Sequence, residues 1–196
     1  MKFLPDIDID CADRNLILEN LKHIPASICV NDECSKHNVG VYFQNIPHDP
    51  ITGISNINYK EADERGYFKV DLLNLNVYKS VKDEKHLMKL MNTEPLWEML
   101  LDAEISKDLF QLGGHIDGLA TSTILNMYKP QTIMELAICI ALIRPRKKHL
   151  IGKPWDYIKE HIWEPGDDSL YGYKKAHAVS YAHVIVVQMN LIMESV

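Results

Sequence analysis

Leu4–Cys11, near the start of this chain, has the alternating sequence LPDIDIDC. Apolar Ile7 and Ile9 alternate with acids, and a period of two is typical of a β-strand with one buried face. Asp has a low strand propensity, and acids that share one strand face repel one another. Asp8 and Asp10 would project from the same face, about 6–7 Å apart along the strand. The pattern therefore predicts a cation between them.

A third aspartate lies in a second predicted strand, Gly66–Leu75. Asp71 interrupts an apolar run there, where a carboxylate without a partner would be costly to bury. If the two strands are neighbours, Asp8, Asp10 and Asp71 can hold two divalent ions about 3.5–4 Å apart. The expected ions are Mg²⁺, with Mn²⁺ as a substitute, because both suit carboxylate ligands. The residues alone also allow a solvated strand edge, with Asp71 capping or turning a loop.

The remaining elements are predicted from apolar spacing, which has a period near 3.6 in helices. Predicted helices cover residues 13–24, 79–91, 94–101, 131–143, 155–163 and 179–192, and a further strand covers residues 39–43. No internal repeat or clear linker is visible. The sequence therefore predicts a single α+β domain over residues 1–196, in which a small mixed sheet carries the acids and packs with several helices. Residues from about 125 to 196 would form a helical subdomain.

Composition narrows the class of protein. Apolar residues make up 46% and charged residues 24%, which is ordinary for a soluble globular protein. The net charge of −6 argues against DNA binding by bulk charge alone. No apolar run reaches the roughly 20 residues that span a bilayer, and the start has no signal-peptide core. The four cysteines have no CxxC spacing, so neither a zinc site nor a disulfide framework is indicated. We expect a soluble protein of a reducing, cytoplasmic compartment, with no membrane partner.

Six short segments resemble motifs of the C-family DNA polymerases, the family of the bacterial DNA polymerase III alpha subunit, in the order found there. The family motifs are PDxDxDF, GKHAGGV, KFDFLGL, VFQLES, ALFRPGP and FNKSHAAAYA. The matching segments are PDIDID at 5–10, SKHNVGV at 35–41, KVDLLNL at 69–75, LFQL at 109–112, ALIRP at 141–145 and YKKAHAVSYA at 173–182. The shared order over most of the chain carries the resemblance.

The resemblance implies a polymerase-beta-like nucleotidyltransferase palm that adds a deoxynucleotide to the 3′-hydroxyl of a DNA primer in replication. Asp8, Asp10 and Asp71 would be catalytic and would hold two Mg²⁺ ions. Lys69 would bind triphosphate oxygens, and Arg144 would contact phosphates of the incoming nucleotide or the template-primer. Further nucleotide or DNA contacts are expected at Lys36, His37, Lys175 and His177.

Four of these contact residues also have an ordinary structural explanation. Lys36 and His37 can be solvated loop residues. Arg144 can cap the carbonyl groups at a helix C-terminus. His177 can be a structural, hydrogen-bonded histidine.

The chain departs from the family in several places. It is several times shorter, and the glycine-serine motif that cradles the triphosphate upstream of PDxDxD has no counterpart. Cys11 stands in place of Phe, Ala176 in place of the Ser before the motif histidine, and Arg146 in place of a Gly. We expect a minimal or split polymerase, of a size that suits a phage or another mobile element. A second protein chain would supply the missing polymerase parts.

Two other functions stay open at this point. The chain can be a catalytically inactive, palm-derived module that binds DNA or other replication proteins, as the missing triphosphate cradle suggests. It can also be a metal-dependent nuclease, because two-metal sites support hydrolysis equally well.

Overall fold

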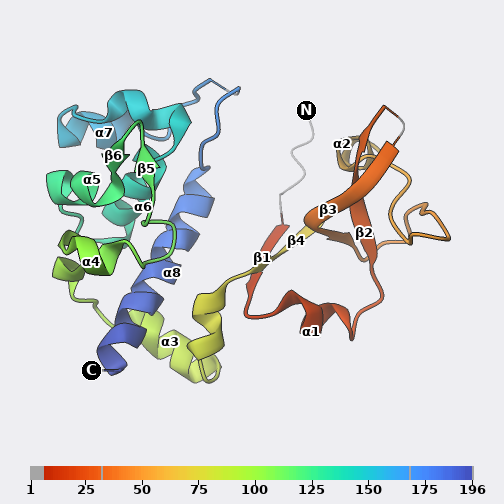
Figure 1. The fold of residues 1–196 in the computed structure, drawn as a ribbon, viewed down its shortest axis with the longest axis horizontal. Coiled ribbons are helices and arrows are strands. Elements are labelled where there is room, and N and C mark those ends of the chain that lie inside the picture. Colours follow the sequence, from red (N-terminus) through yellow and green to blue (C-terminus); the bar gives the residue numbers. More distant parts are fainter. Residues whose placement is uncertain (1–6, 32, 168, 196) are drawn as a thin grey trace. The chain divides into compact units, whose positions relative to one another are not determined.

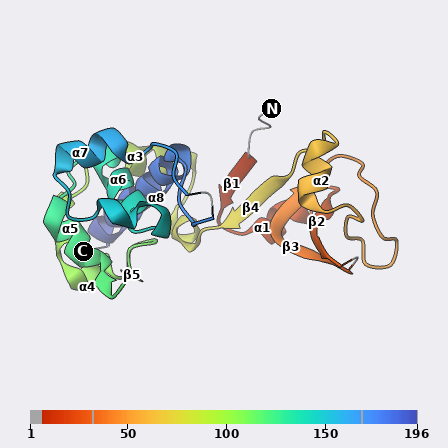
Figure 2. The same ribbon diagram turned by 90° about the horizontal axis from the view of Figure 1, so that it is seen from above.

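The computed structural model describes residues 7–31, 33–167 and 169–195, and Figure 1 and Figure 2 show its ribbon from two directions. The chain divides into two compact units, Met1–Ser80 and Val81–Val196. The first contains a mixed four-stranded sheet and the second is mainly helical. The predicted α+β class is therefore confirmed, whereas the single palm-like domain stays a prediction. The expected start of the first strand, Asp6 included, lies outside the described residues.

The sheet of the first unit has the strand order β1-β4-β3-β2 (Figure 1). Its strands are β1 (Ile7–Cys11), β2 (Ile24–Val30), β3 (Glu33–Tyr42) and β4 (Val70–Asn74). The same unit contains the helices α1 (Arg14–Leu18) and α2 (Tyr59–Glu64) and the 3₁₀ helix η1 (Asn76–Ser80). β1 runs parallel to β4, whereas the other strand pairs are antiparallel. The predicted mixed sheet is therefore confirmed.

Two apolar clusters hold this unit together. The first consists of Cys11, Val41, Val70 and Leu72, with Ile7, Ile17 and Leu18 packed against it. The second consists of Ile24, Ala26, Tyr42, Ile46, Ile57 and Ala62, with Tyr67 packed against it. The first cluster uses odd-numbered residues of β1 and even-numbered residues of β4. Because side chains alternate along a strand, the even-numbered acids of β1 and the odd-numbered Asp71 lie on the other face.

The predicted helix over residues 13–24 is only partly correct. Asp13 caps α1 as expected, since its carboxylate accepts from the backbone N–H of Asn15, but the helix ends at Leu18 and Ile24 begins β2. Pro25 explains the difference, because the residue before a proline is disfavoured in the α conformation. The alternation of β2 is masked by its small and polar residues.

The expectation of no disulfide is wrong for Cys29 and Cys34. These residues lie opposite each other in the β2–β3 pair and are joined by a disulfide, with their Cα atoms 4.0 Å apart. Spacing rules for metal and redox motifs carry no information about hairpin register, so sequence reasoning cannot find this pair. Cys11 and Cys139 are buried free thiols. Because disulfides persist in oxidising surroundings, the pairing conflicts with the cysteine argument for a reducing compartment.

The second unit contains helices and one small hairpin. Its elements are α3 (Glu84–Asn92), η2 (Trp97–Leu101), α4 (Ala103–Ser106), β5 (His115–Ile116), β6 (Leu119–Ala120), α5 (Thr121–Tyr128), α6 (Ile133–Leu142), η3 (Pro145–Leu150), α7 (Trp155–His161) and α8 (Lys175–Glu194). The predicted helices at 131–143, 155–163 and 179–192 are confirmed. The segment predicted as a helix at 94–101 forms the 3₁₀ helix η2 over part of its length.

Helices α6 and α8 lie side by side in the core of this unit (Figure 1, Figure 2). Every residue of α6 from Leu136 to Leu142 is buried, which is typical of a helix that is apolar on all sides. α8 contributes Ala178, Ala182, Ile185 and Met189 to the same cluster. Their spacing of three or four residues places them on one stripe of the helix.

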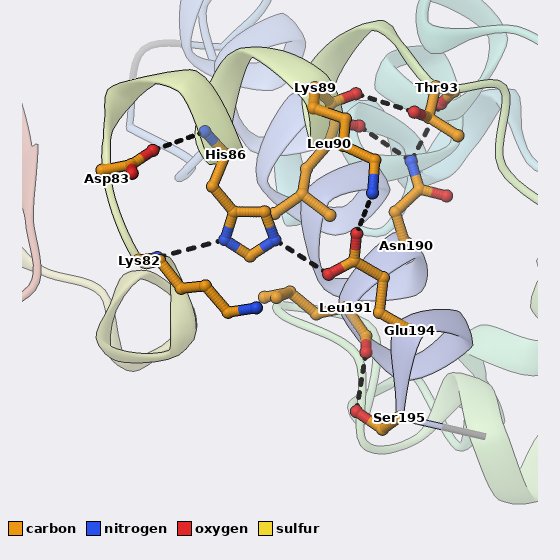
Figure 3. Close-up of polar contacts among 10 residues, drawn as sticks. All are labelled: Lys82, Asp83, His86, Lys89, Leu90, Thr93, Asn190, Leu191, Glu194 and Ser195. Carbon is orange, nitrogen blue, oxygen red and sulfur yellow. Dashed lines mark hydrogen bonds and ion pairs between the residues drawn. The ribbon is translucent and has the colours of Figure 1, made fainter.

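Polar contacts fix α3 against the last turns of α8 (Figure 3). Glu194 accepts hydrogen bonds from His86 Nε2 at 2.8 Å and from Lys89 Nζ at 2.5 Å. The bond from Lys89, followed by that from His86, lowers the pKa of Glu194 to about 2. The buried amide of Asn190 donates to two carbonyl oxygens at the end of α3, each at 2.8 Å. These bonds satisfy a buried polar group and fix the pairing of the two helices.

Among the described residues, α8 alone is long and apolar enough to cross a membrane by length and composition, and 44% of its apolar window is buried inside the protein. The core helix of a soluble protein passes the same test. The packing of α8 is therefore compatible with the expected soluble protein.

Candidate active site

Asp8 and Asp71 lie directly opposite each other where β1 and β4 pair in parallel. Neighbouring strands are about 4.8 Å apart, and residues in register point to the same face. Asp10 follows two residues after Asp8, opposite Leu73, and therefore shares that face. All three acids are half-buried, and Asp71 lies within β4 rather than in a loop. The strand pairing thus gathers three carboxylates on the sheet face away from α1.

Lys69 contacts the third acid. It immediately precedes β4, and its ammonium group forms an ion pair with Oδ1 of Asp71. Both side chains are 20% exposed, so water only partly screens the pair. The ring of Tyr59, at the start of α2, lies 6.0 Å from Lys69 Nζ, within the range of cation–π attraction.

Gly40 leaves room for this lysine. It lies opposite Asp71 on the β3 side of β4, and a Cβ at this position would come within 2.5 Å of Lys69 Cδ and 3.0 Å of His37 Nδ1. His37 Nδ1 accepts the backbone N–H groups of Val39 and Gly40, at 3.3 and 2.9 Å. Burial, and then the charge of Lys69, lower the pKa of His37. The ring is therefore neutral at pH 7, with its proton on Nε2.

Lys36 is separated from this arrangement. It is exposed, pairs with Ser27 of β2 and directly precedes His37. Within the described residues, no hydrogen bond or ion pair links it to the acids. The strand pairing thus brings His37, but not Lys36, to the Lys69–Asp71 pair.

Three further residues of the first unit could not be identified from the sequence. Tyr59 contacts Lys69 as described above. Tyr78 of η1 lies close enough to Asp10 that this carboxylate, after burial, raises the pKa of the phenol. Arg14 donates through Nη1 to the carbonyl oxygen of Asn38. None of the three lies in a segment that matches a family motif, and no pattern in the neighbouring sequence indicates a role for them. Only the folded chain shows where they lie.

Arg144 lies in the second unit, directly after α6. Its Nη2 donates to Oε1 of Gln111 at 2.6 Å, and its guanidinium carbon lies 4.5 Å from the centre of the Tyr173 ring. The Tyr173 hydroxyl donates to the same Gln111 oxygen at 3.2 Å. Gln111 has a positive φ of 64°, which is uncommon outside glycine. Residues from three matched segments, LFQL, ALIRP and YKKAHAVSYA, therefore meet at one point.

Lys175 and His177 also belong to the second unit, in the first turn of α8. Lys175 is exposed and His177 is half-buried. His177 interacts with at least one other group of the protein. These two residues and Arg144 belong to the second unit, whereas the acids and the other predicted contact residues belong to the first.

The acids fit a divalent ion in chemistry and in strand register. Carboxylate oxygens are the ligands that Mg²⁺ prefers, and Asp8 and Asp71 occupy facing positions. In the part of the chain that the structure describes, no three His, Cys, Asp or Glu side chains are gathered as a ready metal-binding group. Asp71 is paired with Lys69 instead. A divalent ion held by all three acids would therefore compete with Lys69 for the carboxylate of Asp71.

No protein-family model matches this chain, and no curated protein matches its sequence.

Proposed function

We propose that this protein is a metal-dependent nucleotidyltransferase that resembles DNA polymerase III alpha and adds a deoxynucleotide to the 3′-hydroxyl of a DNA primer. The observation that supports this most is the parallel register of β1 and β4, in which Asp8 faces Asp71 and Asp10 follows on the same face. In the proposal, this sheet is a polymerase-beta-like palm. The meeting of three other motif segments at Arg144 adds support from the second unit.

The proposed roles follow from the chemistry of each side chain. Asp8, Asp10 and Asp71 hold the ions, which when bound supply positive charge that acidifies the hydroxyl and neutralises the phosphates. Lys69 provides a point charge for triphosphate oxygens, and Arg144 a planar donor for phosphates. Weaker contacts to nucleotide or DNA come from Lys36, His37, Lys175 and His177.

The reaction forms one bond and breaks one. The primer 3′-oxygen attacks the α-phosphorus of the incoming nucleotide, and the bond from that phosphorus to the bridging oxygen of the β-phosphate breaks. Pyrophosphate leaves, and the hydroxyl proton passes to solvent. The protein aligns the two reactants and stabilises the charge that develops on the phosphate oxygens.

Primer extension with Mg²⁺ or Mn²⁺ tests the proposal, using the protein alone and together with a candidate partner chain. Asp8→Asn and Asp71→Asn should each lower extension by about 100-fold or more, because each removes a ligand worth several kcal/mol. Asp63→Asn is the matched control, since Asp63 is an exposed acid of the same unit and should keep its activity. If the wild type adds no nucleotide under conditions in which a full-length polymerase of the family does, the proposal is wrong.

A second candidate function is a catalytically inactive palm that binds DNA or other replication proteins. The ion pair between Lys69 and Asp71 favours it, because this pair satisfies the third acid without a metal. On this alternative, Asp8→Asn and Asp71→Asn leave the biological role intact. Nuclease activity is tested by incubating the protein with labelled DNA and metal but no nucleotide. If the DNA is not cleaved, the nuclease alternative is excluded.

The cellular setting is part of the proposal. DNA and deoxynucleotides are cytoplasmic in a bacterial cell, and a phage-encoded protein would act there too. The disulfide between Cys29 and Cys34 is compatible with this only if the fold tolerates its reduction.

A further inference from the structure

The Lys69–Asp71 ion pair occupies the acid that the proposed chemistry needs for a metal. Lys69 is also the residue expected to bind triphosphate oxygens. The same ammonium group therefore has two anionic partners, the carboxylate of Asp71 and a phosphate chain. The same carboxylate has two cationic partners, Lys69 and a divalent ion.

The surroundings of Lys69 favour its contact with Asp71. Its side chain lies over Gly40, where a Cβ would come within 2.5 Å of Lys69 Cδ and 2.9 Å of Cγ. His37 Nδ1 would lie 3.0 Å from that Cβ, and the Tyr59 ring lies 6.0 Å from the ammonium nitrogen. The lysine is thus accommodated by a glycine, a histidine and an aromatic ring rather than free in solvent.

We propose that Lys69 is an exchangeable counter-ion, which holds Asp71 in the free protein and releases it to a divalent ion when a phosphate chain binds the ammonium group. This inference rests on the proposed function and adds a way in which metal binding at the acids is regulated. Binding of metal at the acids and binding of polyphosphate at Lys69 are then positively coupled. Coupling of this kind is reciprocal, and its usual size is about 5–150-fold in affinity.

The first arm of the test measures Mn²⁺ binding from the loss of the free-ion electron paramagnetic resonance signal at neutral pH, without nucleotide. Lys69→Met should bind Mn²⁺ at least about fivefold more tightly than the wild type, because the competing cation is gone. Lys22→Met is the matched control, since it removes an exposed lysine of the same unit that has no proposed role, and its affinity should stay within about twofold of wild type. Gly40→Ala keeps the charge of Lys69 but displaces its side chain. It should therefore also tighten Mn²⁺ binding, but by less than Lys69→Met does.

The second arm uses inorganic tripolyphosphate in the presence of a chelator, with binding measured by calorimetry. Asp71→Asn should bind it at least about fivefold more tightly than the wild type, because Lys69 no longer has a carboxylate partner. Asp10→Asn removes a charge from the same sheet face without removing the partner of Lys69, and its gain should be smaller. The double variant Lys69→Met/Asp71→Asn should not show the tighter tripolyphosphate binding of Asp71→Asn, because the ammonium group that binds the phosphates is gone.

The outcomes separate this inference from the proposed function. If Lys69→Met and wild type bind Mn²⁺ equally and Asp71→Asn abolishes that binding, the metal site stands and the counter-ion role is wrong. If neither wild type nor Lys69→Met binds Mn²⁺, both are wrong. Equal tripolyphosphate affinities of Asp71→Asn and Asp10→Asn would also overturn the counter-ion role.

Discussion

The hydroxyl group of Tyr42 is buried and has no hydrogen-bond partner among the described residues. Its side chain is fully buried in the second apolar cluster of the first unit. Burial, followed by the charges of Asp63 and Asp71, raises the pKa of Tyr42 to about 12. The phenol is therefore neutral at any ordinary pH, and its hydroxyl group carries a desolvation cost.

Replacement of this residue tests that cost. Tyr42→Phe should raise the free energy of unfolding by about 1 kcal/mol, because a buried hydroxyl without a partner costs about 1–3 kcal/mol. Urea unfolding followed by circular dichroism measures the change. Tyr67→Phe, in the same cluster but only partly buried, should change stability less. A loss of stability in Tyr42→Phe would show that the hydroxyl is hydrogen-bonded.

At this scale, some features of the site are predictable from the sequence and others are not. Alternation alone predicts that Asp8 and Asp10 share a face, because it depends only on local strand geometry. The contact of Lys69 with Gly40 depends on how strands about thirty residues apart pair. No local pattern encodes that register, so the counter-ion arrangement becomes visible only in the folded chain.

At the scale of elements, strongly periodic segments are the predictable ones. The apolar helix at 131–143 and the helix at 179–192 have the period of buried helices and appear as α6 and α8. The β2 strand is missed because the apolar spacing of a helix continues to Ile24, whereas helix α1 itself already ends at Leu18. The disulfide is missed because it depends on hairpin pairing.

The contact between α3 and α8 makes a prediction about acid stability. The pKa of Glu194 is about 2 in the folded protein, against an ordinary 4.5. A carboxylate with a depressed folded pKa stabilises the fold fully above its unfolded pKa, and the effect is lost as the pH falls through the folded pKa. Glu194→Gln should therefore be less stable than the wild type at neutral pH, and the difference should fade between about pH 4.5 and 2.

Thermal unfolding at a series of pH values measures this difference. Glu160→Gln, in an exposed position of α7, is the control and should follow the wild type throughout. A Glu194→Gln difference that does not vary with pH would contradict the role of the charged carboxylate.

The disulfide of the β2–β3 hairpin makes a second prediction at this scale. Changing both Cys29 and Cys34 to Ser should lower the free energy of unfolding by about 2 kcal/mol, because the unfolded chain loses a short closed loop. Chemical unfolding without reductant measures it, and reductant should lower the stability of the wild type to that of the variant. If reductant leaves the wild type unchanged, the two thiols are not paired in solution.

At the scale of the whole molecule, the chain contains two units with separate apolar cores. The second unit has a length typical of single domains, and its core is built around α6 and α8. Residues 81–196 expressed alone should give a helical circular dichroism spectrum and a cooperative thermal transition. A gradual, non-cooperative transition would show that this unit depends on the first.

The α+β class could be predicted from the order of strand and helix patterns. The boundary between the two units after Ser80 could not be predicted. The sequence predicts a helical subdomain only from about residue 125, because no change of composition marks position 80. The proposed catalytic acids lie in the first unit, whereas the proposed nucleotide or DNA contact residues lie in both. Motif order predicts which residues these are, and the fold of each unit then gives their contacts.

We propose above all that Asp8, Asp10 and Asp71 together hold divalent ions. The decisive measurement is anomalous scattering from a crystal of the whole protein soaked with Mn²⁺ and an incoming nucleotide. We expect two ions held by the three carboxylates, with Lys69 moved from Asp71 to the nucleotide phosphates. An ordered nucleotide with no ion at these acids, and an intact Lys69–Asp71 pair, would contradict it.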